Sequence, residues 1–208
     1  IRIPHPVSIQ LDTVVFYSKS KTCPAPETGL TDEWKRVLSN FWPTSIKIRE
    51  ANDDRLLEFL SVEHYFQACK ARCSTKPLMF DLFHVNGEVG RKTTAEAKKA
   101  GGRAAYKKNG ADLNIHEWNS KRDQCMIRAI RARYQQDELF RTVLDSTKGM
   151  KLLHFERSGE KSYWGGNFSK QNGEQVGTNK LGRILMKVRN EAENEARLPT
   201  QRIPDQPE

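Results

Sequence analysis

The spacing of apolar residues changes along this chain, and that change limits the folds it can form. From residue 61 onward most apolar residues recur every three or four positions, which predicts amphipathic helices. Short alternating runs, which are typical of strands, occupy residues 13–17, 45–49, 55–60 and 151–155. A few short strands among many helices cannot build a large sheet. The pattern therefore predicts an α+β fold, mainly helical, in a single domain.

Local signals set the expected ends of the helices. The predicted helices span residues 61–73, 77–85, 97–100, 115–135, 137–146 and 178–195. Thr93 and Glu96 form a capping-box pattern, and Thr178 would cap the final helix. Residues 52–54 would form the turn between the second and third strands, and Gly101-Gly102 would end a helix.

These elements define one expected domain with two flanking segments. The domain covers residues 13–195, after an irregular leader at 1–12. Prolines mark the tail at 196–208, which is expected to be disordered. The chain shows neither an internal repeat nor a P-loop or dinucleotide-binding glycine pattern, so no cofactor is expected.

The distribution of charge favours an anionic ligand. The chain has 35 Lys and Arg against 26 Asp and Glu, which gives a formal net charge of +9. The tail from Asn190 onward holds two of these bases and five of these acids, so the remaining body carries about +12. A body this basic attracts phosphates or nucleic acid, although a basic surface without a specific partner has the same composition.

Composition also argues against several other classes of protein. No apolar run approaches the roughly 18 residues that span a membrane, and the first residues lack the apolar core of a signal peptide. Cys69 and Cys73 lie four positions apart with no second pair at metal-ligand spacing, so no metal is expected. The remaining cysteines are Cys23 and Cys125. Reduced thiols in an intracellular protein, cytoplasmic or nuclear, fit this pattern.

Residues 61–73 carry the strongest chemical signal. On a helix Glu63, Gln67 and Lys70 occupy positions i, i+4 and i+7, so they share one face beside an apolar one. A partly buried glutamate there would suit general acid–base work, and a desolvated lysine can attack a carbonyl or imine carbon. The same spacing is common on amphipathic helices, where Glu63 would only cap the helix and Lys70 would only be a solvated charge.

A glycine- and aromatic-rich segment lies near the end of the domain. Trp164 is followed by Gly165 and Gly166, and the loop enters a helix near Thr178, where free N–H groups suit phosphate. Trp164 could present a flat face to a base or a ribose, and Asn179 lies in the first turn. The alternative is a glycine-rich connector beside a core tryptophan.

Other polar and aromatic residues are weaker candidates. Asn40 and Phe41 belong to a polar–aromatic cluster beside a strand, where Asn40 could bind a ligand or cap a turn. Trp118 lies near the start of the longest predicted helix and could stack on a base or pack in the core. Four of the five histidines are expected to be structural or surface residues, because their spacing does not suit a metal; these are His64, His84, His116 and His154.

Four motifs taken together resemble the YbiA/NADAR family. They are Phe16-Tyr17-Ser18, Leu38-Ser39-Asn40-Phe41, Glu63-His64-Tyr65-Phe66-Gln67-Ala68 with Lys70, and Tyr163-Trp164-Gly165 followed by Gly177-x-Asn179-x-Leu181-Gly182-Arg183-x-Leu185-Met186-x-Val188-Arg189. They span about residues 13–190, and the glutamate motif and the last motif are the specific ones. The resemblance favours the functional interpretation of Glu63 and Lys70 over the structural one.

The resemblance implies a YbiA-like fold and an N-glycosidase that acts on ribosylated amines. It implies a catalytic glutamate at Glu63, a Schiff-base lysine at Lys70 and a functional tryptophan at Trp118. Substrate contacts are expected from Asn40, Phe41, Gln67, Trp118, Tyr163, Trp164, Gly165 and Asn179. No metal is needed, because the lysine amine replaces a metal-activated water.

The resemblance leaves three functions open. The leading one, which the basic body of the chain supports, is removal of ADP-ribose from the amino group of guanine in nucleic acid. The second is hydrolysis of ribosylamino-pyrimidine phosphates, which are intermediates of riboflavin synthesis. The third is a non-catalytic module that binds ADP-ribose or NAD.

Two departures from the family pattern affect substrate choice. Many bacterial members carry an aspartate two residues before the tyrosine of Tyr-Trp-Gly, where this chain has Lys161. A second carboxylate role therefore does not carry over. The chain also inserts about residues 21–36 before Leu38.

Overall fold

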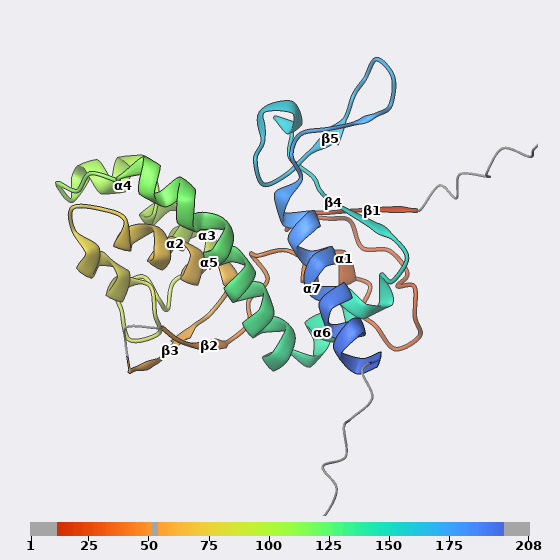
Figure 1. Ribbon diagram of the computed structural model, residues 1–208, viewed down its shortest axis with the longest axis horizontal. Helices are drawn as coiled ribbons and strands as arrows, with labels where there is room; N and C mark the ends of the chain where they lie inside the picture. Colours follow the sequence, from red (N-terminus) through yellow and green to blue (C-terminus); the bar gives the residue numbers. More distant parts are fainter. Residues whose placement is uncertain (1–11, 51–53, 198–208) are drawn as a thin grey trace, which may run out of the picture.

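The computed structural model describes residues 12–50 and 54–197. The elements are β1 (Thr13–Phe16), α1 (Trp34–Val37), β2 (Ile46–Arg49), β3 (Leu56–Phe59), α2 (Val62–Arg72), the 3₁₀ helix η1 (Pro77–Leu82), α3 (Thr94–Ala100), α4 (Arg103–Lys108), α5 (Ile115–Gln136), α6 (Glu138–Ser146), β4 (Lys151–His154), the 3₁₀ turn η2 (Gly159–Lys161), β5 (Asn167–Phe168), β6 (Gln175–Val176) and α7 (Lys180–Arg197). The predicted α+β class with mainly helical content is confirmed (Figure 1).

The strands form small, separate sheets. β1 and β4 pair in parallel, with Thr13 opposite Lys151 and Phe16 opposite His154, although the two strands are far apart in the sequence. β2 and β3 pair antiparallel, as the alternating pattern predicted. Most of the predicted turn at 52–54 lies outside the described residues. Each predicted strand is thus confirmed to within a residue or two at its ends.

Helix α5 connects the two sides of the molecule. It contacts α2 and β2 on one side and α6 and α7 on the other. In Figure 1 the segment from α2 to α4 lies to the left of α5, and the β1–β4 pair with α1, α6 and α7 lies to the right. A long helix placed in this way lets residues from both sides meet at its N-terminal half.

Helix α2 is buried on nearly every side. It packs against η1, α3, α5 and β3. Of its eleven residues only Lys70 and Arg72 are not buried. A helix buried all round cannot keep its polar side chains in bulk water, so Glu63 and Gln67 are carried into the interior of the fold.

Several element boundaries differ from the sequence prediction. Residues 77–85 were expected to form an α-helix but form the shorter 3₁₀ helix η1, in which Pro77 is the first residue. Gly101 ends α3 as predicted, but Gly102 then caps the unpredicted helix α4. The final helix begins at Lys180 and not after a Thr178 cap, because Asn179 adopts a left-handed φ of 48° immediately before it. The capping box of Thr93 is confirmed.

Candidate active site

A cavity of about 610 Å³ opens beside α2 and is called the central cavity here. Glu63, Gln67 and Lys70 of α2 all line it, so the predicted shared face is confirmed. Residues of the other elements complete the wall: Tyr17, Ser18, Ser39, Asn40, Phe41, Phe66, Ala95, Lys98, Trp118, Met126, His154, Phe155, Glu156, Trp164 and Leu181. The volume is in the range that holds a small-molecule ligand.

Glu63 is held in place by its own helix. Ser61 caps α2, and the backbone N–H of Glu63 donates to the carbonyl of Asn40 at 3.3 Å. Its carboxylate Oε1 accepts a hydrogen bond of 2.7 Å from Gln67 Nε2. Burial raises the pKa of Glu63 above its ordinary value, and the bond from Gln67 and the charges of Lys98 and Lys70 oppose that rise. The carboxyl group is therefore fixed in direction and able to hold a proton.

Lys70 is less buried than Glu63 and lies two turns along the same face. Its Nζ donates to the carbonyl of Gly101 at 2.6 Å and lies 5.6 Å from the centre of the Tyr106 ring. Burial lowers the pKa of Lys70; the carboxylate of Glu63 opposes this shift and Lys98 adds to it. A lysine whose pKa is lowered is a better nucleophile near neutral pH, because more of it is the free amine.

Aromatic side chains form one wall of the central cavity. The ring of Phe66 meets Trp118 edge-on, with centroids 4.8 Å apart, and meets Trp164 at 5.2 Å and 89°. Phe66 thereby fixes the orientation of both indoles, which line the cavity. Trp118 is only 5% exposed, so the core-packing and ligand-contact interpretations of this residue are both compatible with its position.

Several buried polar atoms at the cavity have no hydrogen-bond partner among the described residues. These are Asn40 Oδ1, Gln67 Oε1 and His154 Nδ1. Asn40 Nδ2 donates a hydrogen bond to the sulfur of Met126, at 3.3 Å. Buried polar groups are normally satisfied, so unpaired ones at a cavity indicate a polar ligand or water.

Three predicted contact residues lie outside the central cavity's wall. The Asn179 side chain accepts from His154 N at 3.0 Å and donates to the Leu152 carbonyl at 2.8 Å, so it ties the start of α7 to β4. Tyr163 donates to Asp123 at 2.6 Å. Gly165 allows a close chain approach, since a Cβ there would lie 2.7 Å from the His154 carbonyl oxygen.

The N–H groups expected to hold phosphate at the start of α7 are already used. Those of Thr178, Asn179, Lys180 and Leu181 donate to carbonyls between Ser162 and Gly165. The prediction of a phosphate site there is therefore wrong. The glycine-rich segment serves instead to let two loops approach each other closely, as the alternative interpretation had it.

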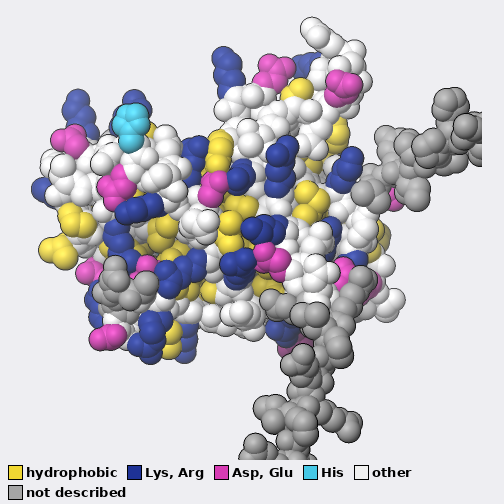
Figure 2. All heavy atoms as spheres, viewed as in Figure 1, with side chains coloured by type: hydrophobic (Ala, Val, Ile, Leu, Met, Phe, Trp, Pro, Cys, Tyr) yellow, Lys and Arg dark blue, Asp and Glu magenta, His cyan; other side chains and the backbone are white. Residues whose placement is uncertain are grey.

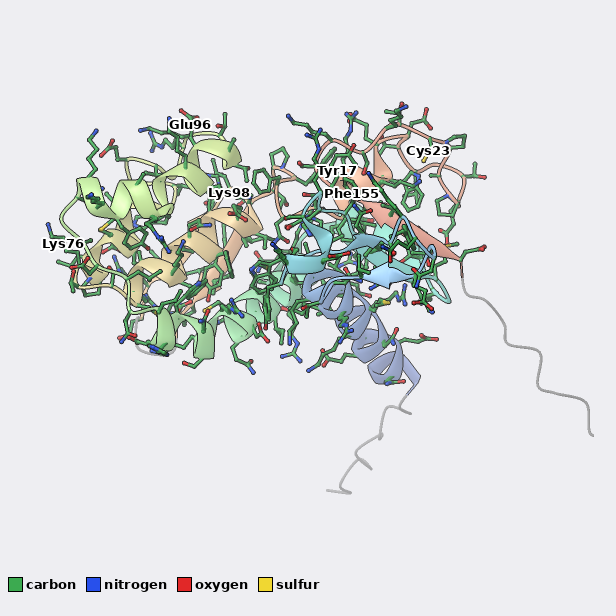
Figure 3. The ribbon with its side chains drawn as sticks, turned by 90° about the horizontal axis from the view of Figure 1, so that it is seen from above. Tyr17, Cys23, Lys76, Glu96, Lys98 and Phe155 are labelled. Atoms are coloured by element: carbon green, nitrogen blue, oxygen red, sulfur yellow. The ribbon has the colours of Figure 1, made fainter. Side chains whose placement is uncertain are left out.

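The structure adds residues to the site that were not among the predicted catalytic or substrate-contact residues. Tyr17, Lys98, His154 and Glu156 all line the central cavity. Tyr17 and Phe155 lie on the β1–β4 side and Lys98 on the α3 side (Figure 3). His154 had been assigned a structural or surface role, but its ring is largely buried and burial lowers its pKa. The parallel pairing of β1 with β4 brings Tyr17 and His154 together, and no local sequence signal predicts that pairing.

The insertion and the departure at Lys161 lie away from these groups. Trp34 of α1 is buried, and its indole donates to the Pro24 carbonyl at 3.3 Å, so the inserted segment folds back on itself. Lys161 is exposed at the end of η2.

Within residues 12–50 and 54–197, no three His, Cys, Asp or Glu side chains are grouped as metal ligands would be. Among the same residues, no helix has the length and apolar character needed to cross a membrane.

Comparisons with known proteins identify the family of this chain. The NADAR domain matches residues 28–193. The chain is 31% identical over 157 residues to an N-glycosidase of Nostoc punctiforme, covering 76% of this chain and 85% of that protein. It is 28% identical over 198 residues to N-glycosidase YbiA of Shigella flexneri, covering 90% and 92% of the two chains.

Two further relatives extend the comparison. The chain is 33% identical over 155 residues, 74% of its length, to the chloroplastic riboflavin biosynthesis protein PYRR of Zea mays, and the match spans only 23% of that longer protein. The solution structure of Escherichia coli YbiA superposes with a TM-score of 0.60 at 25% identity, covering 90% of this chain and 89% of that one. The chain therefore belongs to the NADAR family, and it has the YbiA-like α+β fold.

Proposed function

We propose that this chain is an N-glycosidase that hydrolyses the bond between the anomeric carbon of a ribose and an exocyclic amine. The names of its bacterial relatives support the reaction type. The observation that carries the proposal is the placement of Glu63 and Lys70 in one cavity. Burial raises the pKa of Glu63 and lowers the pKa of Lys70, so it favours the neutral form of each group. Neutral forms suit a proton donor beside an amine nucleophile.

The proposed reaction begins with the ring-opened form of the glycosylamine. When the sugar ring opens, C1 becomes part of an imine with the substrate nitrogen. The neutral amine of Lys70 adds to C1, forming a C–N bond while the imine π electrons move to the substrate nitrogen. The ammonium proton of the added Lys70 nitrogen passes to the substrate nitrogen, and Glu63 protonates that nitrogen a second time. The bond from C1 to the amine then breaks with its electron pair, and a protonated Schiff base to Lys70 and the carboxylate of Glu63 remain.

Water completes the cycle. The carboxylate of Glu63 takes a proton from water as the oxygen adds to C1, and collapse of the resulting carbinolamine expels Lys70 and leaves the sugar aldehyde. The sum is one water consumed, one amine released and one free sugar, with both side chains restored. In this scheme Asn40 and Gln67 would contact the sugar, and Trp118 and Trp164 would stack on the base.

The substrate we propose is ADP-ribose attached to the amino group of guanine in nucleic acid. Lys and Arg side chains are numerous on the face that α5 and α7 share (Figure 2), and a groove between α5 and β2 is lined by Lys47, Arg49, Arg128 and Arg131. Such a surface attracts a phosphate backbone. The alternative is a ribosylamino-pyrimidine phosphate, which the similarity to the maize riboflavin biosynthesis protein favours.

Borohydride trapping tests the covalent step. Reductant added during turnover should fix one sugar on Lys70, detected by peptide mass spectrometry. Lys70→Arg should give no adduct, whereas Lys99→Arg, an exposed lysine on α3 outside the cavity, should trap as the parent does. An active preparation that traps nothing, or traps on Lys98, would rule out Lys70 as the nucleophile.

Turnover of two substrates separates the alternatives. The chain should release ADP-ribose from an ADP-ribosylated guanine oligonucleotide faster than it hydrolyses a ribosylamino-pyrimidine phosphate. The reverse order would favour the riboflavin-intermediate reaction. Tight binding of ADP-ribose with no turnover of either substrate would refute the glycosidase proposal and indicate a binding module.

A further inference from the structure

We propose that a second cavity, adjoining the central one, binds the phosphate carried on C5 of the substrate's ribose. This inference rests on the proposed function, because it assumes that the sugar lies at Lys70. The second cavity has a volume of about 680 Å³ and is lined by parts of α4 and α5 and the loop between them. It is called the basic cavity here.

The two cavities share a border. Lys70 and Trp118 line both of them. A sugar whose C1 lies at Lys70 therefore has two directions in which its substituents can extend. One substituent is the amine-bearing base on C1, and the other is the phosphate on C5 at the opposite end of the ribose.

The charges of the two linings differ. In the central cavity Lys70 and Lys98 are balanced by Glu63 and Glu156. The basic cavity adds Arg103, Lys107 and Arg122 to the shared lysine, against the single acid Asp112. A phosphate is therefore stabilised more in the basic cavity, and the uncharged base fits the central cavity with its two indoles.

Free hydrogen-bonding groups indicate that the basic cavity is built for a polar ligand. Tyr106 is only 3% exposed and lines this cavity, yet its hydroxyl has no hydrogen-bond partner in the described part of the chain. The same holds for the buried Nε of Arg122, whose guanidinium is positioned 3.5 Å from the centre of the Tyr163 ring. An O–H and an N–H without acceptors suit the oxygens of a phosphate.

Two other places for the phosphate are less suitable. At the start of α7 the backbone N–H groups are already bonded to carbonyls. The groove between α5 and β2 shares no lining residue with the central cavity, so a phosphate on the sugar held at Lys70 does not lie there; its Arg131 is also paired with Glu191 and its Arg128 with Glu50. In contrast, Arg103 and Lys107 are exposed and form no ion pair or side-chain hydrogen bond within residues 12–50 and 54–197.

The test measures binding directly, so that it does not depend on turnover. Calorimetry measures the affinity of the parent chain and of the double variant Arg103→Ala/Lys107→Ala for ribose, ribose 5-phosphate and ADP-ribose. Both replaced side chains are exposed, so the fold should be retained. Lys99→Ala/Lys108→Ala is the matched control, because it removes two exposed lysines of α3 and α4 that do not line the cavity.

The expected result is a loss of at least tenfold in affinity for both phosphorylated ligands in the double variant and no such loss in the control. Tyr106→Phe, which removes only the hydroxyl, should weaken both severalfold. A change below twofold in the double variant, or equal binding of ribose and ribose 5-phosphate by the parent, would overturn the inference. If the parent binds ADP-ribose at least tenfold more tightly than ribose 5-phosphate, the site takes a diphosphate. If it binds the two ligands equally, the site takes a phosphate monoester.

Turnover by the same variants distinguishes this inference from the proposed function. If the function holds, Arg103→Ala/Lys107→Ala should raise KM and leave kcat within about threefold, since it removes binding that the ground state and the transition state share. A parent chain that binds phosphate as described but turns over neither substrate would sink the function and keep the phosphate site. If Arg103→Ala/Lys107→Ala turns over substrate normally with an unaltered KM, the proposed function would stand and the phosphate site would be refuted.

Discussion

Replacing Gly101 by alanine tests whether Gln67 positions the carboxylate of Glu63. An added Cβ would lie 2.0 Å from Gln67 Oε1 and 2.6 Å from its Cδ, and it would meet no other chain atom as closely. The backbone of Gly101 has a φ of −86°, which alanine adopts without strain. The overlap therefore falls on the flexible end of Gln67, which must leave its present position, and with it the geometry of its bond to Glu63.

The expected loss follows from the bond that is broken. Gln67 Nε2 donates to Glu63 Oε1 at 2.7 Å. Hydrogen bonds to charged groups contribute about 1.5–3 kcal/mol, so losing this one should lower kcat about 10- to 100-fold. The bond also holds the pKa of Glu63 down, so its loss should move the acidic limb of the pH–rate profile to higher pH.

A double-mutant cycle is the assay. Steady-state rates are measured for Gly101→Ala, Gln67→Ala and the two combined, with urea unfolding as the control for folding. If the overlap with Gln67 is the cause, Gly101→Ala should cost little more once Gln67 is already alanine. Two results would show that Gly101→Ala does not act through Gln67. One is that the rate losses of the two single variants multiply in the double variant, and the other is a Gly101→Ala rate within twofold of the parent.

The remaining predictions concern single side chains. Glu63→Gln should lower kcat several hundred-fold or more, within the usual range for an acid–base group, and a loss below threefold would contradict that role. The same variant should raise the urea midpoint near neutral pH. Burial raises the folded-state pKa of Glu63, so stability falls as the pH rises from 4.5 through that higher value, and glutamine removes the loss. Lys98→Met should move both limbs of the pH–rate profile upward, because Lys98 lowers the pKa of Glu63 and of Lys70; the exposed Lys99→Met should move neither. Arg133→Met should cost about 3–5 kcal/mol in urea unfolding, because Arg133 is 0% exposed and its removal leaves the charge of Asp137 unpaired. A cost below about 1 kcal/mol would contradict it.

The sequence predicted the elements with strong local signals. Strands β1, β2, β3 and β4 and helices α2 and α5 follow directly from apolar periodicity and capping residues, and the structure confirms them. The shared face of Glu63 and Lys70 was predictable for the same reason, because helical spacing fixes which side chains lie together.

The parts that local signals could not predict depend on contacts between distant segments. His154 reaches the cavity because β4 pairs with β1 across more than a hundred residues, and Lys98 because α3 packs on α2. Asn179 shows the opposite case: its position in a motif suggested a ligand contact, but its amide is used to join α7 to β4. The short helix α4 was missed because Gly101-Gly102 ends one helix and begins the next.

The burial of α2 connects the stability of this fold with the chemistry proposed for it. A surface helix with the same residues would leave Glu63 and Lys70 fully ionised in water, where neither a proton donor nor a free amine is available near neutral pH. Packing α2 against α3, α5 and η1 removes that water and shifts both groups toward their neutral forms. The attraction between the Glu63 carboxylate and the Lys70 ammonium opposes the effect of burial, so it limits how far each pKa shifts. The depth of α2 in the core therefore determines how far the pair departs from ordinary surface residues, and changes in the packing around α2 should reach the chemistry through these two pKa values.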